Sequence, residues 1–289
     1  MSELLMDLAD CGSPERLIQA ILRHHPHWEP PVPIEALATA VNISEIRELE
    51  TQGFEGALVT NPGKTEGVIF HRAGTPDGRR RFTIGHELGH FLIPTHTGNQ
   101  QCKSGDMSQT GFKTPEQRRE YEANRFAAGV LMPKPWFERD TDRLGDPDVT
   151  HVLELSRRYR TSFEATVNRF VELSGPPCAF VFSLDGKIRY VRKSPNFPQM
   201  SVAAGQRLPS DSATVVKPPA LLRAASPWYE VEGATWLYAE WGRRTQNVLE
   251  QSMRQANGYQ VTLLTLADDD LAADDDDTGD TGEWRAPSF

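Results

Sequence analysis

The spacing of apolar residues changes several times along the chain, and each change marks an expected element. Apolar residues recur at three- and four-residue steps in several segments, which predicts helices. These segments are Pro14 to His25, Pro33 to Val41 and Pro115 to Met132. The runs 56–60 and 66–70 have the character of strands and flank a turn at 61–63. The first half is therefore expected to pack helices against a small antiparallel sheet.

Beyond Pro133 the helical spacing continues and then gives way to strands. Helices are expected on both sides of 160–162, where Thr and Ser side chains can cap the second helix. The Asp-Gly pair at 185–186 and the Asn-Gly pair at 257–258 are typical of tight hairpin turns. The runs that flank these turns are 178–184 with 187–192 and 247–253 with 259–266. We therefore predict a mostly β C-terminal domain.

The net charge is concentrated at one end of the chain. Eight Asp, one Glu and one Arg between residues 268 and 289 carry −8 of the formal charge of −9, so the rest is nearly neutral. A segment of this kind buries too little apolar surface to order itself, and we expect a disordered, solubilising tail. The alternative is a decoy that mimics nucleic acid or docks on a basic partner.

Composition and cysteine usage predict a cytoplasmic protein with no membrane partner. With 38% hydrophobic and 25% charged residues, the chain is typical of globular proteins. No apolar run approaches the roughly 20 residues that span a bilayer, and the first residues lack the basic segment of a signal peptide. The three cysteines stand far apart, which favours reduced thiols over a disulfide framework.

The candidate chemistry begins with the His-Glu-x-x-His pattern at residues 86–90. On a helix, residues four apart point about 40° from one another, so His86 and His90 can present two imidazoles to one metal ion. Glu87 would lie beside them, where a carboxylate can deprotonate water activated by zinc. The alternative is an amphipathic helix with two incidental histidines.

The candidates for a third ligand lie on the predicted helix 115–132, because a catalytic zinc normally has three protein ligands and keeps a fourth position for water. Glu120 lies at the edge of the apolar stripe of that helix, whereas Glu122 lies on its flank. We favour Glu120, with Glu122 as the alternative. Asn124, one turn after Glu120, could orient a ligand histidine through a hydrogen bond.

Two stretches of the sequence resemble the ImmA/IrrE metallopeptidases of bacteria. One is Arg-Phe-Thr-Ile-Gly-His-Glu-Leu-Gly-His at 81–90, and the other is Glu-x-Glu-Ala-Asn-x-Phe-Ala at 120–127 with Leu-Met-Pro at 131–133. Both motifs occur in the order and with the flanking residues typical of the family. The similarity extends with decreasing clarity from about residue 33 to residue 171.

This resemblance implies an activity and a set of site residues. His86, His90 and Glu120 would bind zinc, and Glu87 would be the catalytic base. Members of the family typically cut a helix-turn-helix repressor, and thereby release genes for DNA-damage tolerance or mobile-element transfer. The resemblance therefore implies a repressor protein as the substrate.

A polar stretch at 95–113 separates the two predicted metal helices and contains His96 and Cys102. We interpret both as ordinary surface residues, with a role as a fourth zinc ligand as the alternative for each. A further alternative for Cys102 is a redox switch, because a thiolate near zinc would displace the water.

Three further features could bind other partners. The basic run 79–81 could contact nucleic acid, but we interpret it as a solvated face or a set of internal ion pairs. The helix pair around 160–162 resembles a helix-turn-helix, but we interpret it as a roof over the peptidase core. Direct DNA binding is therefore not expected. Aromatic residues crowded into 228–241 indicate the core of a small domain, with a ligand platform as the alternative.

The predicted fold is α+β: a zincin-like metallopeptidase domain with a small antiparallel sheet and a helical roof, followed by a mostly β C-terminal domain. The expected parts are an N-terminal helix and Pro-rich linker (1–32), the metallopeptidase domain (33–147), the helix-turn-helix-like pair (148–175), the β domain (176–267) and the acidic tail (268–289). The predicted function is that of a zinc endopeptidase. The alternatives are a DNA-binding or stress-sensing regulator with a structural metal site, and a metal protein without catalysis.

Overall fold

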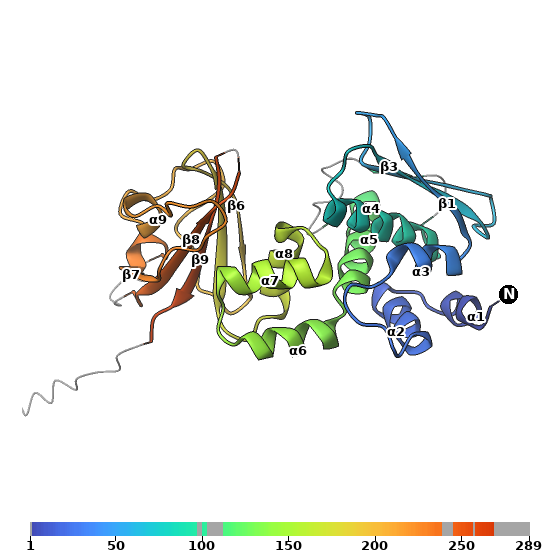
Figure 1. Cartoon of the computed structure of the whole chain (residues 1–289), viewed down its shortest axis with the longest axis horizontal. Helices are drawn as coiled ribbons and strands as arrows, with labels where there is room; N and C mark the ends of the chain where they lie inside the picture. The colour runs from blue at the N-terminus through green and yellow to red at the C-terminus, as the bar shows by residue number, and fades with distance from the viewer. Residues whose placement is uncertain (1, 97–99, 103–111, 239–244, 257, 269–289) are drawn as a thin grey trace, which may run out of the picture.

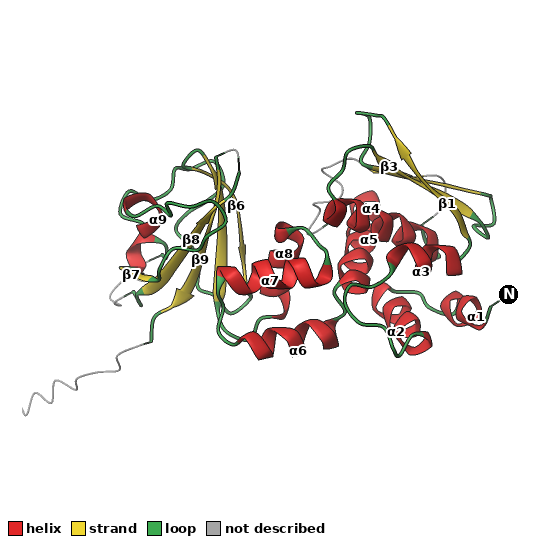
Figure 2. Cartoon of the chain, in the orientation of Figure 1, coloured by secondary structure: helices red, strands yellow, loops and turns green. Residues whose placement is uncertain are grey.

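The computed structural model describes residues 2–96, 100–102, 112–238, 245–256 and 258–268. Each half of the molecule contains one β-sheet, and helices lie beside and between the sheets (Figure 1, Figure 2). The predicted α+β class is confirmed. In the part of the chain that the structure describes, no helix is long and apolar enough to cross a membrane. Trp241, Asn257, the acidic tail from 269 and most of the polar stretch 95–113 lie outside the described residues.

The first half contains five helices and four strands among its described residues. They are α1 (Glu3–Ala9), α2 (Pro14–His24), α3 (Ile34–Ala40), β1 (Ile43–Leu49), β2 (Gly56–Thr60), β3 (Gly67–Arg72), α4 (Asp77–Leu92), β4 (Gln100–Cys102) and α5 (Pro115–Leu131). Helices α2, α3, α4 and α5 were predicted from the sequence, and α1 was not. Thr114 with Gln117 has the sequence pattern of a capping box, and Thr114 caps α5 because its side chain accepts a hydrogen bond from the backbone N–H of Gln117.

The first sheet has the strand order β1-β3-β2-β4. The predicted hairpin is β2 with β3, which pair in antiparallel fashion. Strand β1 was not predicted, and it adds a parallel pair with β3. Strand β4 pairs antiparallel with β2 and places Cys102 opposite Gly56. The edge strand β4 thereby brings part of the polar stretch 95–113 to the sheet.

Helices α4 and α5 cross at a contact made by small residues. A Cβ added to Gly85 would lie 3.3 Å from Cα of Ala127, and one added to Gly89 would lie 3.1 Å from Cα of Ala123. Such distances are shorter than ordinary van der Waals contact, so the two backbones approach as closely as their atoms allow. The close approach of the two backbones therefore fixes the distance between the facing side chains of α4 and α5.

The second half contains a five-stranded antiparallel sheet with the order β6-β5-β9-β8-β7. Its elements are α6 (Lys134–Leu144), α7 (Val149–Tyr159), α8 (Phe163–Leu173), β5 (Cys178–Leu184), β6 (Lys187–Lys193), α9 (Ala213–Val216), β7 (Tyr229–Val231), the 3-10 helix η2 (Gly233–Thr235), β8 (Val248–Arg254) and β9 (Tyr259–Leu266). Both predicted hairpins are confirmed. Asp185 and Gly186 have φ angles of 48° and 74°, the positive values that a type I′ turn requires.

The apolar core changes at the end of α5. A first apolar cluster joins α1 to α5 with the first sheet and includes Leu131. A second apolar cluster begins at the next residue, Met132, and joins α7 and α8 to β5 and β9. The helix pair, expected as a roof over the peptidase core, thus buries its apolar side chains against the second sheet. Ser162 caps α8 as predicted.

Two other expectations are settled by contacts. The basic run 79–81 makes internal ion pairs: Arg79 lies 3.6 Å from Glu55, and Arg80 lies 2.6 Å from Glu35. Trp236 is fully buried and Trp228 packs against the second apolar cluster, so these two aromatic residues belong to the interior. Both observations favour the structural interpretation over contacts with nucleic acid or a ligand.

Candidate metal centre

The His-Glu-x-x-His pattern lies on α4, as the sequence indicates, and its three polar residues are buried. Nε2 of His86 and Nε2 of His90 are 3.1 Å apart, so the two imidazoles converge on one point. This convergence follows from their positions one helical turn apart.

Glu120, on α5, completes a three-residue group with these histidines. Its Oε2 atom lies 3.2 Å from Nε2 of His86 and 3.5 Å from Nε2 of His90. This oxygen is buried and makes no hydrogen bond of normal geometry among the described residues. Glu122 points elsewhere and pairs with His96 and Arg118. Of the two candidate glutamates, the structure therefore brings Glu120 to the histidines.

Cys102 joins the same group, and the interpretation of this residue as an ordinary surface cysteine is wrong. Its side chain is buried, and Sγ lies 3.3 Å from Nε2 of His86 and 3.7 Å from Nε2 of His90. The donor atoms of His86, His90, Cys102 and Glu120 all lie within 4.8 Å of one another. The pairing of β4 with β2 places this sulfur at the histidines, and because that pairing joins distant residues, the sequence suggested a position near zinc only as an alternative.

A second layer of residues holds the two imidazoles. Oδ1 of Asn124 lies 2.8 Å from Nδ1 of His86, the contact expected from the sequence. His96 was interpreted as a surface residue, and this too is wrong: it is buried, and its Nδ1 lies 3.1 Å from Nδ1 of His90. Nε2 of His96 in turn lies 3.0 Å from Oε2 of Glu122. With Nδ1 of each α4 histidine engaged in this way, Nε2 is left to bind a metal.

Lys64 anchors the end of α4. Its ammonium group donates hydrogen bonds to three backbone carbonyls, those of His90 (2.7 Å), Ile93 (2.9 Å) and His96 (2.7 Å). The last carbonyls of a helix have no partner within the helix, and a cation there also complements the helix dipole. Lys64 therefore ties the β2–β3 turn to the C-terminal end of α4, just beyond His90.

Burial and mutual interaction shift the pKa values of the group. Burial raises the pKa of Glu87 to about 7, against the opposing effects of His86 and Cys102. Burial lowers the pKa of His90 to about 4, although Glu120 opposes this shift. Burial alone would raise the pKa of Glu120, but the adjacent imidazoles of His86 and His90 hold it far below its usual range. At neutral pH the group thus offers a neutral imidazole at His90 and an ionised carboxylate at Glu120.

This set of donors suits zinc. Zinc accepts imidazole nitrogen, carboxylate oxygen and thiolate sulfur, usually four donors at the corners of a tetrahedron. The two nitrogens, one oxygen and one sulfur converge here without a lysine or arginine among them. Hard cations such as magnesium prefer oxygen ligands and fit this group less well.

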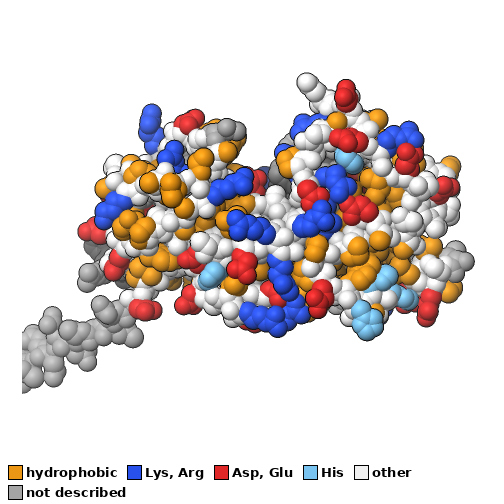
Figure 3. All heavy atoms as spheres, in the orientation of Figure 1, with side chains coloured by type: hydrophobic (Ala, Val, Ile, Leu, Met, Phe, Trp, Pro, Cys, Tyr) orange, Lys and Arg blue, Asp and Glu red, His pale blue; other side chains and the backbone are white. Residues whose placement is uncertain are grey.

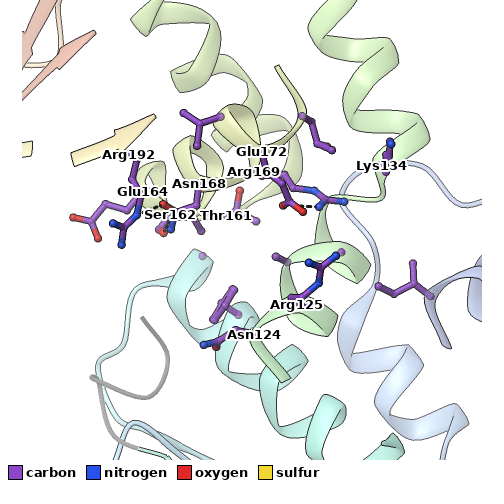
Figure 4. A pocket seen from close by; sticks show the side chains of 18 of the residues that line it. Asn124, Arg125, Lys134, Thr161, Ser162, Glu164, Asn168, Arg169, Glu172 and Arg192 are labelled. Atoms are coloured by element: carbon purple, nitrogen blue, oxygen red, sulfur yellow. Dashed lines mark hydrogen bonds and ion pairs between the residues drawn. The ribbon is translucent and has the colours of Figure 1, made fainter. Parts of the chain in front are cut away.

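A cleft of about 1290 Å³ lies between the two halves of the molecule. The surface is hollowed there in Figure 3, and Lys and Arg side chains gather near the middle of this face. In Figure 4, Asn168 and Arg192 face Asn124 and Arg125 across the cleft. None of the four donor residues is among the described residues that line the cleft, but Asn124 is. The cleft therefore adjoins the metal centre through the residue that contacts His86.

Comparison with known proteins identifies relatives of the middle part of the chain. Residues 44–171 match the family model described as Peptidase_M78, IrrE N-terminal-like domain. The radiation response metalloprotease IrrE of Deinococcus radiodurans is 28% identical over 120 residues, which cover 42% of this chain and 35% of that protein. The chain thus matches about a third of the length of this curated relative.

One solved structure resembles nearly the whole chain. It is a Mycobacterium tuberculosis transcriptional regulator, which matches with a TM-score of 0.56 and 16% identity. The match covers 92% of this chain and 77% of that one. At this identity the similarity establishes a shared fold, in which the second half is included.

Proposed function

We propose, from the premise that residues 44–171 make this chain a member of the ImmA/IrrE metallopeptidase family, that the protein is a zinc-dependent endopeptidase. The observation that carries the proposal is the convergence of Nε2 of His86, Nε2 of His90 and Oε2 of Glu120 within 3.1 to 3.5 Å. Three protein ligands of this kind are typical of catalytic zinc. His86, His90 and Glu120 would hold the metal.

Glu87 is the proposed general base. When bound, zinc would supply Lewis acidity and lower the pKa of water toward about 7. Glu87 lies next to His86 in the chain and is fully buried, so it adjoins the ligands without being one of them. A carboxyl in this place can take a proton from the attacking water and then return it to the leaving amine.

The second layer would orient the ligands. Asn124 would fix the ring of His86, and the pair of His96 and Glu122 would fix the ring of His90. Partners of this kind set the tautomer of a ligand histidine and increase its affinity for the metal.

The proposed substrate is a helix-turn-helix transcriptional repressor, and this proposal depends on family resemblance. It would place the protein in the cytoplasm and give it a role in derepressing stress-response or mobile-element genes. The cleft between the halves supports a protein substrate, because it is larger than the roughly 300–1,000 Å³ of most small-molecule sites and touches the metal centre through Asn124. DNA binding through α8 is not favoured, since Glu164 and Glu172 lie on the face of α8 that lines this cleft.

The test combines metal analysis with cleavage. Purified full-length chain should contain about one zinc per molecule, and His86→Ala or His90→Ala should lose it. Zinc-loaded wild type should cut a helix-turn-helix repressor encoded near its own gene at one site, located by mass spectrometry of the fragments. Glu87→Gln should keep zinc and lose cleavage, because the substitution removes the base but no ligand.

Three results would contradict the proposal. They are the absence of zinc from the wild type, undiminished cleavage by Glu87→Gln, and full zinc content in His86→Ala. Digestion of unfolded casein at many sites would leave the peptidase activity standing, but would contradict a selective protease.

A further inference from the structure

The two histidine nitrogens and the Cys102 sulfur are spaced like three corners of a zinc tetrahedron. With bond lengths of about 2.0–2.1 Å to nitrogen and about 2.3 Å to sulfur, such a tetrahedron separates two nitrogens by about 3.3 Å and nitrogen from sulfur by about 3.6 Å. The two histidine nitrogens are 3.1 Å apart, and Sγ of Cys102 lies 3.3 and 3.7 Å from them. Cys102 thus occupies the corner that a catalytic site leaves to water.

Backbone pairing holds the sulfur at this corner. Cys102 ends β4 and lies opposite Gly56 on β2, and its carbonyl accepts a hydrogen bond from the backbone N–H of Glu55 at 2.9 Å. The thiol is therefore presented by a strand that is bonded to the sheet, two residues beyond the point where β4 begins. A side chain that merely filled space there would need no such alignment of Sγ with both imidazoles.

The same arrangement closes the centre to a substrate. His86, Glu87, His90 and Cys102 are all buried, and the side chain of Glu120, at 18% exposed, is the most accessible of the ligand group. An extended peptide needs access to the zinc and to the base together. While Cys102 lies against the two histidines, a peptide can reach neither the zinc nor Glu87.

We propose that Cys102 is a fourth zinc ligand and that its thiolate holds the centre closed in the resting protein, so that cleavage requires Cys102 to leave the zinc. This inference depends on the proposed function, because it concerns the same zinc site. Four protein ligands are typical of closed zinc sites, whereas catalytic sites have three and an open position. On opening, the zinc–sulfur bond breaks, the sulfur takes up a proton to become a thiol, and water fills the vacated position. No oxidant or reductant is needed for this ligand exchange.

The first experiment replaces zinc with cobalt(II) in the full-length protein. The wild type should show the near-ultraviolet charge-transfer band of a cobalt–thiolate bond together with visible bands of tetrahedral cobalt. Cys102→Ser should lose the thiolate band and keep bound cobalt through His86, His90 and Glu120. Cys178→Ala is the matched control, because Cys178 is also buried but lies in the second half. It should keep the band.

The second experiment asks whether the fourth position is open. Acetohydroxamate, a small chelating probe, should change the visible cobalt spectrum of Cys102→Ser but not that of the wild type at the same concentration. Zinc affinity should fall at least about tenfold in Cys102→Ser, since loss of a ligand should cost no less than loss of a supporting residue. X-ray absorption at the zinc edge of the wild type needs no variant, and should show one sulfur at about 2.3 Å.

The outcomes separate this inference from the proposed function. If zinc binds with nitrogen and oxygen neighbours only, or if the wild type and Cys102→Ser bind acetohydroxamate equally well, the closed state is overturned and the peptidase proposal stands. If neither zinc nor cobalt binds the wild type, both are overturned.

Discussion

Nδ1 of His96 lies 3.1 Å from Nδ1 of His90, on the side of the His90 ring opposite the proposed metal position. The other nitrogen of the same ring, Nε2 of His96, lies 3.0 Å from Oε2 of Glu122. A carboxylate, an imidazole and a ligand imidazole thus form one line of hydrogen bonds. The line explains why a residue in a polar stretch and a glutamate on the flank of a helix are both held in place.

The first prediction concerns Glu122. The helical pattern alone suggested an exposed charge of little consequence, but the side chain is only 20% exposed and holds His96. Glu122→Ala should therefore lower zinc affinity by about 10- to 100-fold, the usual cost of losing such a supporting partner. Competition with a chromophoric chelator measures the change. Glu116→Ala, at an exposed position on the same helix, is the control, and equal affinities for the two variants would exclude the role of Glu122.

The second prediction concerns the pH dependence of stability in the metal-free protein. Burial raises the pKa of Glu87 from 4.5 to about 7, so the folded state retains a proton that the unfolded state releases. The resulting stability is fully present below pH 4.5 and is lost as pH rises through 7. Glu87→Gln should lack this loss. The difference between the free energies of unfolding of wild type and variant should therefore change by about 3 kcal/mol between pH 4.5 and pH 7. Urea denaturation at several pH values measures it, and parallel curves would contradict it.

The third prediction concerns the anchor at the end of α4. Lys64→Met keeps most of the aliphatic side chain but leaves the carbonyls of His90, Ile93 and His96 without their cation. Hydrogen bonds to charged groups contribute more than neutral ones, so the free energy of unfolding should fall by about 2 kcal/mol. Lys187→Met, at an exposed position on β6, should change it little. A similar effect of both substitutions would show that the anchor adds no stability.

The fourth prediction tests the helix crossing. Gly89→Ala places a Cβ 3.1 Å from Cα of Ala123 and 3.2 Å from Cβ of Phe126, so α5 must move outward. Such overpacking costs about 1–3 kcal/mol of stability, and it should also weaken zinc binding by moving Glu120 away from His90. Gly12→Ala, where an added Cβ meets nothing within 4 Å, is the control. Unchanged zinc affinity in Gly89→Ala would show that α5 adjusts without displacing Glu120.

The fifth prediction concerns a buried carboxylate in the second half. Glu250 accepts hydrogen bonds from Ser212, from the backbone N–H of Thr214 and from the indole of Trp236. Glu250→Gln replaces one acceptor oxygen with a donor that faces other donors, and should lower the free energy of unfolding by about 2 kcal/mol. Glu230→Gln, at an exposed position, should have little effect. Thermal and urea denaturation would show whether the two variants differ.

Features determined by neighbouring residues could be predicted from the sequence. Thr114 and Ser162 cap their helices, and the Asp-Gly pair at 185–186 forms its hairpin, because each signal acts within a few residues. The periodicity of α5 separated Glu120 from Glu122 for the same reason. These local signals were enough to predict that His86, His90 and Glu120 lie close together.

Features determined by distant partners could not be predicted. Strand β1 depends on pairing with β3, and its irregular pattern carries no strong signal of its own. Cys102 and His96 belong to a polar stretch, and they become buried only because that stretch crosses from α4 to the edge of β2. The apolar faces of α7 and α8 were evident, but an apolar face does not identify the surface that covers it.

The change of core between Leu131 and Met132 determines where the chain can be divided. Similarity to the peptidase family extends to residue 171, yet α7 and α8 bury their apolar faces against the second sheet. A chain truncated after residue 175 would expose those faces to water and is expected to aggregate. A chimera of two relatives should therefore fold when the chains are joined at the end of α5, and should fail to fold when they are joined at residue 171, where the sequence similarity ends.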